Sequence, residues 1–394
     1  MFIKEINLLG FRNYLEANLE LDRQKTIIIG RNAQGKSNLI EVIQLLSQFK
    51  SRRAKKDAEL INFSLDQAVI KVKIKDTKES DEGDIYNSSF WDEESSEELD
   101  ELAVLIRKSG RRTYKLNGAN KKPKELLHKV LCVSFMSEDL NIINSSPSTR
   151  RDFLDSVIKQ LSSEYADNLS KFEKTLSQRN SFLKDLVEKG KYYPSNLNQS
   201  EKGQLEIWND LFIEEANKVS KAREDFLAKL KPCAEDFYQK ISGSEASKLD
   251  FDYLGEQLDA SMLNESLGRD LARGYSNLGP HRDDFEIKLN DIAAMSFASQ
   301  GEKRSIMLAV KLSELELLKE QHNDYPILLL DDVLAELDED RQDFLLDAVN
   351  SQAQVIITTT HLGKHLEKWS EDSQIIEIEA GQIIKNNRQE LTTA

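Results

Sequence analysis

The spacing of apolar residues changes along this chain, from the short period of β-strands to the longer period of α-helices and back again. In the first third, short apolar runs are separated by glycine and charged residues. Runs at 2–9 and 17–29 predict a hairpin that leads into a further strand. The alternation at 69–74, together with runs at 102–106 and 114–116, predicts an antiparallel sheet.

The middle of the chain predicts helices. From 150 to about 243 the apolar residues form two stripes, one between Phe153 and Leu176 and another between Trp208 and Leu230. A segment with a proline and several Asn and Ser residues, 189–203, separates them. The simplest interpretation is an antiparallel helical pair whose first helix runs to about Val187.

The last third returns to alternating helices and strands. The pattern predicts helices at 301–320 and 340–349 and strands at 327–330 and 355–360. A chain of 394 residues also exceeds the size at which single cores stop growing. We therefore expect a mixed α/β domain divided between 1–149 and 269–394, with a helical lobe inserted at 150–268.

Charge is strongly segregated. The formal net charge is −15, but residues 76–101 hold 12 acidic residues and one lysine, which leaves −15 + 11 = −4 for the rest. This acidic stretch predicts a loop insertion between strands. A compact basic run holds the candidate contacts to DNA phosphates, which are Lys50, Arg52, Arg53, Lys55 and Lys56. The alternative, a solvated end of the preceding helix, stays open.

The chain shows no sign of a membrane or secreted protein. Its N-terminus lacks a basic region followed by an apolar core, and no window approaches 18 uncharged apolar residues. Cys132 and Cys233 lie far apart without a neighbouring ligand pattern, which suits a reducing compartment and predicts no metal site from cysteine. We expect a cytoplasmic protein.

A phosphate-binding loop follows the apolar run that ends at Ile29. The pattern G-x-x-x-x-G-K-S is made by Gly30, Arg31, Asn32, Ala33, Gln34, Gly35, Lys36 and Ser37. The glycines let backbone N–H groups surround the phosphates of ATP, Lys36 neutralises the β- and γ-phosphates, and the Ser37 hydroxyl holds Mg²⁺. The alternative is an ordinary turn from strand to helix.

Two carboxylates end the apolar run at 327–330. An uninterrupted apolar run predicts a central strand buried on both faces, where charged residues need a reason. We interpret Asp331 as a Mg²⁺ ligand and Asp332 as the group that orients or deprotonates the attacking water. The alternative is that both residues cap the following helix.

Two weaker candidates flank these carboxylates. Ser299 and Gly301 open a helix whose free N–H groups form an anion site, although Ser299 and Glu302 also match a simple capping box. His361 ends the strand at 355–360 and is a candidate sensor of the γ-phosphate, with Asp338 bordering the same site. The alternative for His361 is an ordinary surface residue.

Taken together, these motifs resemble those of ABC-type ATPase heads, the group that includes transporter ATPases, SMC and Rad50 proteins and the RecF family. The similarity to the RecF family is close and covers nearly the whole chain. The matching segments, in RecF order, are 8–14, 32–37, 135–140, 150–155, 279–284, 299–303 and 331–338. The insertion is too short for an SMC coiled coil.

This resemblance implies a weak ATPase that binds DNA as an ATP-dependent homodimer, in which Ser299 and Gly301 of one subunit meet the γ-phosphate held by the other. It also places Arg12 and Asn13 among the nucleotide-binding residues. In this family the dimer helps RecO and RecR load RecA onto gapped, single-stranded DNA, which supports recombinational repair, replication and the SOS response. Hydrolysis is slow and resets the clamp.

Some residues depart from the family pattern. Ser137 stands where RecF proteins tend to have proline, no glutamine lies between 129 and 140 to serve as a further Mg²⁺ ligand, and Glu302 stands where ABC heads commonly have glutamine. Two rival functions remain: a scaffold head like those of SMC and Rad50 proteins, and a transporter ATPase subunit.

Overall fold

A computed structural model describes residues 1–75, 99–349 and 353–387. The chain folds into two compact units, one formed by Met1–Asp139 with Lys311–Ala394 and the other by Leu140–Val310. Of the predicted acidic insertion at 76–101, residues 76–98 lie outside the described part. The prediction was too long at its end, because Asp100 and Glu101 already pair with β4 as the start of strand β5.

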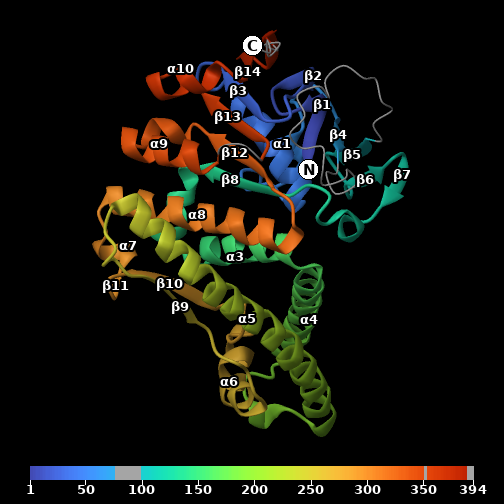
Figure 1. The fold of residues 1–394 in the computed structure, drawn as a ribbon. Coiled ribbons are helices and arrows are strands. Elements are labelled where there is room, and N and C mark those ends of the chain that lie inside the picture. The colour runs from blue at the N-terminus through green and yellow to red at the C-terminus, as the bar shows by residue number, and fades with distance from the viewer. Residues whose placement is uncertain (76–98, 350–352, 388–394) are drawn as a thin grey trace. The chain divides into compact units, whose positions relative to one another are not determined.

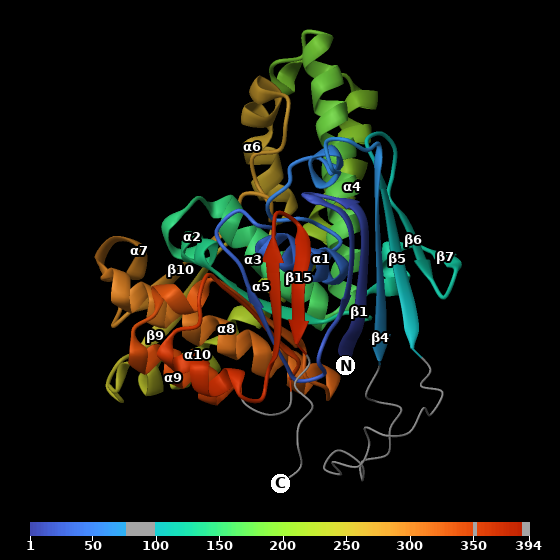
Figure 2. The ribbon, with the colours of Figure 1, turned by 90° about the horizontal axis from the view of Figure 1, so that it is seen from above.

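The first unit contains the predicted antiparallel sheet, in the order β2-β1-β4-β5-β6-β7, which Figure 2 shows from β1 to β7. Its strands are β1 (Phe2–Phe11), β2 (Tyr14–Glu20), β4 (Gln67–Lys75), β5 (Asp100–Arg107), β6 (Thr113–Leu116) and β7 (Ala119–Lys121). The hairpin predicted near the N-terminus is the pair β1 and β2. On β4 the residues alternate between buried and exposed or half-buried, so one face of the strand supplies the core.

The second sheet of this unit has the order β15-β14-β3-β13-β12-β8, which Figure 1 shows from β14 to β8. Its strands are β3 (Lys25–Ile29), β8 (Cys132–Met136), β12 (Ile327–Asp331), β13 (Val355–Thr359), β14 (Gln374–Glu379) and β15 (Gln382–Asn387). All pairs from β14 to β8 are parallel. Every residue of β12 is buried, which confirms the predicted central strand. Helices α9 (Glu339–Ala348) and α10 (Lys364–Ser370) follow β12 and β13 in the chain.

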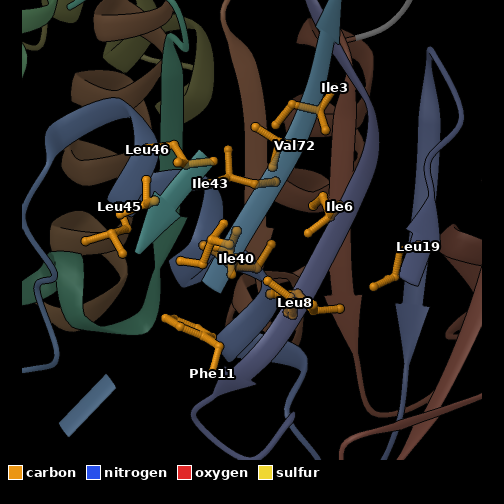
Figure 3. Close-up of a cluster of buried hydrophobic side chains, with 14 of the residues drawn as sticks. Ile3, Ile6, Leu8, Phe11, Leu19, Ile40, Ile43, Leu45, Leu46 and Val72 are labelled. Carbon is orange, nitrogen blue, oxygen red and sulfur yellow. The ribbon is translucent and has the colours of Figure 1, made fainter. Parts of the chain in front are cut away.

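Helix α1 (Lys36–Gln48) lies in the core shared by the two sheets. Figure 3 shows Ile43 of this helix beside Val72 of β4 and Ile40 near Leu8 of β1, and the same cluster includes Leu329 of β12. Full burial of an isoleucine side chain stabilises a fold by roughly 1.5–3 kcal/mol. The apolar residues of α1 therefore fix the helix, and with it the loop that precedes it.

The second unit combines helices with a small antiparallel sheet in the order β11-β10-β9. The elements are α2 (Asn141–Asn144), α3 (Pro147–Leu161), α4 (Ser163–Glu188), α5 (Gln199–Ser242), β9 (Leu249–Leu254), α6 (Ala260–Arg273), β10 (Asp284–Leu289), β11 (Ile292–Ala293) and α7 (Ala294–Phe297). Helix α8 (Gln300–His322) starts in this unit and ends in the first. Among the described helices, including α5 with its 44 residues, none is both long and apolar enough to span a membrane.

The predicted long first helix was wrong, because it is broken into α3 and α4 at Ser162. The backbone of Ser162 is extended, with φ −146° and ψ 116°, and its hydroxyl accepts a hydrogen bond from the N–H of Tyr165 at 3.2 Å. Ser162 thus ends one helix and caps the next. Apolar residues keep a helical period on both sides of the break, so the period alone did not reveal it.

The second unit also extends beyond the helical lobe predicted at 150–268. The unit is larger because β10 is bound to its helices: Arg150 of α3 donates two hydrogen bonds, of 2.6 and 2.7 Å, to Asp284 of β10. Strands β9 and β10 pair along their full length, and β9 packs against α5. The strands therefore belong with the helices and not with the larger sheets.

Candidate nucleotide site

The loop between β3 and α1 has the conformation that its glycines permit. Gly35 has a φ of 117°, and a Cβ atom there would lie 2.7 Å from the Asn13 side chain and 2.9 Å from the Tyr14 hydroxyl. Glycine is therefore required for both backbone and space. Arg31, Asn32 and Ala33 of the loop are exposed, whereas Gly35 and Lys36 are buried.

Lys36 is held over the loop. Its ammonium donates hydrogen bonds to the carbonyls of Gly30, at 2.8 Å, and Arg31, at 3.3 Å, and it lies 3.6 Å from Asp332 Oδ2. Only 3% of the lysine is exposed. A buried cation at a helix N-terminus is suited to binding phosphate oxygens.

Asp331, Ser37 and Thr358 form one cluster of oxygen atoms. The hydroxyls of Ser37 and Thr358 donate to the same oxygen of Asp331, Oδ1, at 3.0 and 2.6 Å. Burial raises the pKa of the Asp331 carboxyl, the two hydrogen bonds lower it, and Asp332 and Glu138 raise it further. A carboxylate next to a hydroxyl is the kind of ligand pair that Mg²⁺ prefers, so the two predicted metal ligands are brought together.

Thr358 is a site residue that sequence reasoning missed. It lies opposite Asp331 in the β12–β13 register, and its hydroxyl also accepts the N–H of Asp332 at 3.0 Å. The available signal was the pair of hydroxyl residues, Thr358 and Thr359, that ends the buried strand β13.

Asp332 takes a conformation that differs from its neighbour's. Its φ of 52° lies in the left-handed region, and 35% of its side chain is exposed. Non-glycine residues adopt this region rarely and often where the site requires it. The alternative of a shared helix cap does not describe the pair, because Asp331 lies within β12 and the side chain of Asp332 makes no capping hydrogen bond to the helical turn Val333–Glu336.

The side chains of Arg12 and Asn13 lie near the phosphate-binding loop, where they form hydrogen bonds to other residues of the protein. The guanidinium of Arg12 donates two hydrogen bonds to Glu41 of α1, at 2.9 and 2.7 Å, and a third to the carbonyl of Glu59. Asn13 donates to the carbonyl of Gln34 at 2.9 Å. Direct nucleotide binding by Arg12 and Asn13 stays a prediction.

Ser299 and Gly301 belong to the second unit, at the start of α8. The capping box considered from the sequence is present, since Glu302 accepts hydrogen bonds of 2.7 Å from both the N–H and the hydroxyl of Ser299. These bonds lower the pKa of Glu302. The carboxylate that departs from the ABC pattern thus binds the serine itself.

His361 and Asp338 are surface residues of the first unit. His361 is exposed after β13, and its Nδ1 lies 3.0 Å from the Thr360 hydroxyl. Asp338 caps α9 by accepting the N–H of Arg341 at 3.0 Å. The γ-phosphate role of His361 stays a prediction.

The basic segment after α1 is exposed at all of its predicted DNA contacts, which are Lys50, Arg52, Arg53, Lys55 and Lys56. Because α1 ends at Gln48, these cations follow the helix and do not form its last turn. Arg52 lies 3.2 Å from Asp139, a buried carboxylate after β8 that sequence reasoning did not single out. Asp139 also accepts the N–H of Met136 at 2.9 Å, which ties the basic segment to the end of β8.

The parallel sheet, the phosphate-binding loop and the Asp331 cluster define an ABC-type ATPase head with an inserted lobe. A family model described as the RecF/RecN/SMC N terminal domain matches residues 2–383. The DNA replication and repair protein RecF of Gloeobacter violaceus is 38% identical, over 97% of this chain and 98% of its own length. The protein of that name from Rippkaea orientalis is 37% identical, with coverage of 97% and 99%. The chain therefore belongs to the RecF family.

Solved structures agree with this assignment. A structure of the recombination mediator protein RecF with ATP, in the RecFOR pathway, is 32% identical with a TM-score of 0.83 and covers 98% of each chain. An Smc head bound to a ScpA domain reaches a TM-score of 0.54 at 16% identity, which shows the shared fold alone. The resemblance and the head fold predicted from the sequence are thus confirmed.

Proposed function

We propose that this chain is a DNA replication and repair protein that binds ATP at the loop 30–37 and hydrolyses it slowly. The observation that carries this proposal is the cluster of Lys36, Ser37, Asp331 and Asp332 around one loop. The solved RecF structure with ATP, which spans the same length of chain, supports the choice of nucleotide. Asp332, half-exposed beside Lys36, is the residue placed to orient or deprotonate the attacking water.

We infer that Ser37 and Asp331 would hold Mg²⁺. The fit rests on their geometry, since a hydroxyl and a carboxylate 3.0 Å apart can both face one small cation. When bound, Mg²⁺ would neutralise charge on the nucleotide phosphates. Thr358 then acts as a positioning residue, because it holds the carboxylate of Asp331 and the N–H of Asp332.

We also propose that ATP closes a homodimer in which Ser299 and Gly301 meet the γ-phosphate of the opposite subunit. The dimer would clamp gapped or single-stranded DNA in the cytoplasm and, with RecO and RecR, aid RecA loading in recombinational repair and the SOS response. The exposed basic segment is the surface we assign to DNA phosphates. A scaffold head of the SMC type is the second candidate, favoured only by the shared fold.

Light scattering with and without ATP tests the dimer. Wild type should double its mass with ATP, whereas Lys36→Met and Ser299→Arg should stay monomeric for different reasons. Lys36→Met should lose ATP binding, while Ser299→Arg should keep it, because only the first residue belongs to the loop. Lys229→Met, at an exposed lysine of α5, is the control. A wild type that stays monomeric with ATP contradicts the clamp, and normal dimers of Ser299→Arg contradict its role across the interface.

Binding to gapped DNA at several salt concentrations tests the basic segment. The double variant Lys55→Glu/Lys56→Glu should weaken DNA binding about tenfold or more. The slope of the logarithm of the binding constant against the logarithm of the salt concentration should become smaller by about one to two, roughly one for each lost phosphate contact. The matched control reverses two exposed lysines of α4, Lys171 and Lys174. Equal losses in both double variants would show a general effect of charge and remove the assignment. Binding that ignores ATP would favour the scaffold alternative.

A further inference from the structure

Gln34 of the phosphate-binding loop accepts hydrogen bonds from two segments that are far apart in the sequence, one near residue 13 and one near residue 380. The turn between β14 and β15, Ala380–Gly381, donates two backbone N–H groups to Gln34: Ala380 to the side-chain Oε1 at 2.5 Å and Gly381 to the carbonyl at 2.9 Å. The N-terminal hairpin adds Asn13, whose amide donates to the same carbonyl of Gln34 at 2.9 Å. All of these residues belong to the first unit.

A second carbonyl of the loop, that of Gly35, accepts the N–H groups of Asn38 and Leu39 of α1 and, in addition, a side-chain donor. The hydroxyl of Tyr14 donates to the carbonyl of Gly35 at 3.0 Å, and no part of Tyr14 is exposed. Burial raises the pKa of Tyr14 far above its ordinary value, so the phenol keeps its proton and remains a donor. Asn38 of α1 in turn donates to Asn13 Oδ1 at 2.7 Å, which orients the Asn13 amide toward Gln34.

These contacts also determine where the N–H groups of the loop point. In a planar trans peptide, the carbonyl of one residue and the N–H of the next lie on opposite sides of the chain. Fixing the carbonyls of Gln34 and Gly35 toward Asn13, Tyr14 and Gly381 therefore directs the N–H groups of Gly35 and Lys36 the other way. In loops of this pattern, backbone N–H groups surround the phosphates.

We propose that the Ala380–Gly381 turn, Asn13 and Tyr14 are positioning residues that preset the phosphate-binding N–H groups before nucleotide arrives. The inference rests on the proposed binding of ATP at this loop. It assigns Asn13 an action through Gln34 and gives the C-terminal hairpin a part in nucleotide affinity. Ordering the loop in advance means that less conformational entropy is lost on binding.

The chain offers a matched pair of variants. Gly381 has a φ of +75°, and a Cβ atom there would lie 2.6 Å from the Asn13 carbonyl oxygen, whereas Gly118 has a φ of +79° and nothing within 4 Å. Both glycines are second in two-residue hairpin turns, after Ala380 with φ 48° and Asn117 with φ 49°. Alanine at either site adds the same left-handed strain, but only Gly381→Ala pushes on Asn13 and the loop.

Two measurements test the proposal: titration with a fluorescent ATP analogue, and hydrogen exchange of the loop amides in nucleotide-free protein. We expect Gly381→Ala to weaken the analogue about tenfold, the effect of losing one or two hydrogen bonds, and to speed exchange at 30–37. Gly118→Ala should change neither. Equal affinity and equal loop exchange in the two variants would overturn the proposal.

The two measurements distinguish a failure of this inference from a failure of the proposed function. If wild type does not bind the analogue, ATP binding fails, and the exchange arm still decides whether the turn orders the loop. If Gly381→Ala does not fold, Tyr14→Phe replaces it, because that change removes only the phenol donor to the Gly35 carbonyl, which keeps the N–H groups of Asn38 and Leu39. Faster loop exchange with weaker analogue binding in Tyr14→Phe would support the proposal, and wild-type values for both would overturn it.

Discussion

Arg179 of α4 forms a buried ion pair, and we expect the loss of this arginine to destabilise the second unit strongly. Its guanidinium lies 2.9 Å from Asp270 of α6, and neither side chain has any exposed surface. It also donates to Asn209 of α5 at 2.9 Å and to Ser276 at 2.6 Å. One arginine thus joins three helices and the loop after α6, and Arg179→Met removes all of these contacts at once.

The expected loss of stability in Arg179→Met depends on which hydrogen-bond donors remain for the carboxylate of Asp270. Removing one partner of a buried pair costs about 3–5 kcal/mol, because the other charge stays buried without its counterion. Asp270 would keep two donors, the N–H of Asn277 at 3.0 Å and its amide at 2.8 Å. In addition, Nη2 of Arg179 has no hydrogen-bond partner among the described residues, so the native pair is not fully satisfied. Both facts favour the lower end, about 3 kcal/mol.

Urea unfolding followed by tryptophan fluorescence measures this cost, since Trp208 is next to Asn209 on α5. Adding Asp270→Asn to Arg179→Met removes the second charge and should restore about 1–2 kcal/mol. Lys184→Met is the control, because Lys184 pairs with Glu188 on the same helix at 3.8 Å with both side chains mostly exposed, a pair worth roughly 0–1 kcal/mol. A cost below about 1 kcal/mol for Arg179→Met, or a double variant less stable than the single one, would refute this reasoning.

Three further predictions concern single groups. Burial raises the pKa of Asp331, so the folded protein keeps a proton that the unfolded chain loses, and that stability is lost as pH rises through the raised pKa. Asp331→Asn should therefore stabilise the nucleotide-free protein relative to wild type more at pH 7 than at pH 4, in thermal melts, while it abolishes ATP hydrolysis. Burial raises the pKa of Cys132 to about 11, so in a Cys233→Ser background a thiol reagent at pH 8 should react only as the first unit unfolds. Glu302→Ala should cost about 0.5–2 kcal/mol in urea unfolding by removing the capping box of α8, and an unchanged midpoint would contradict that box.

Much of the fold was predictable because local pattern and burial agree. The uninterrupted apolar run at 327–330 is a fully buried strand, and the alternation at 69–74 is a strand that supplies one face to the core. The phosphate-binding loop was predictable for a different reason. Its backbone conformation needs glycine at Gly35, and its chemistry needs Lys36 and Ser37 beside it, so the requirement is visible in eight consecutive residues.

The misses involve residues whose role depends on partners far along the chain. Ser162 is compatible with a helix interior and with a helix cap, and only the packing of α3 and α4 decides between them. Thr358 is 27 residues from the carboxylate it binds. The boundary of the inserted lobe depends on the pair of Arg150 and Asp284, 134 residues apart. Periodicity carries no information about such contacts.

Because the lobe is inserted between the two segments of the first unit in sequence, the nucleotide site can form only after the last strands of the chain are present. Strand β3, which leads into the phosphate-binding loop, is paired on both sides by strands from the end of the chain, β13 and β14. Until those strands exist, β3 has open edges, and the loop lacks the Ala380–Gly381 turn that holds Gln34. The lobe at 140–310 lies between these segments in sequence, so its residues are synthesised before the site can close. Nucleotide binding therefore depends on the last strands of the chain as much as on the motif near its start.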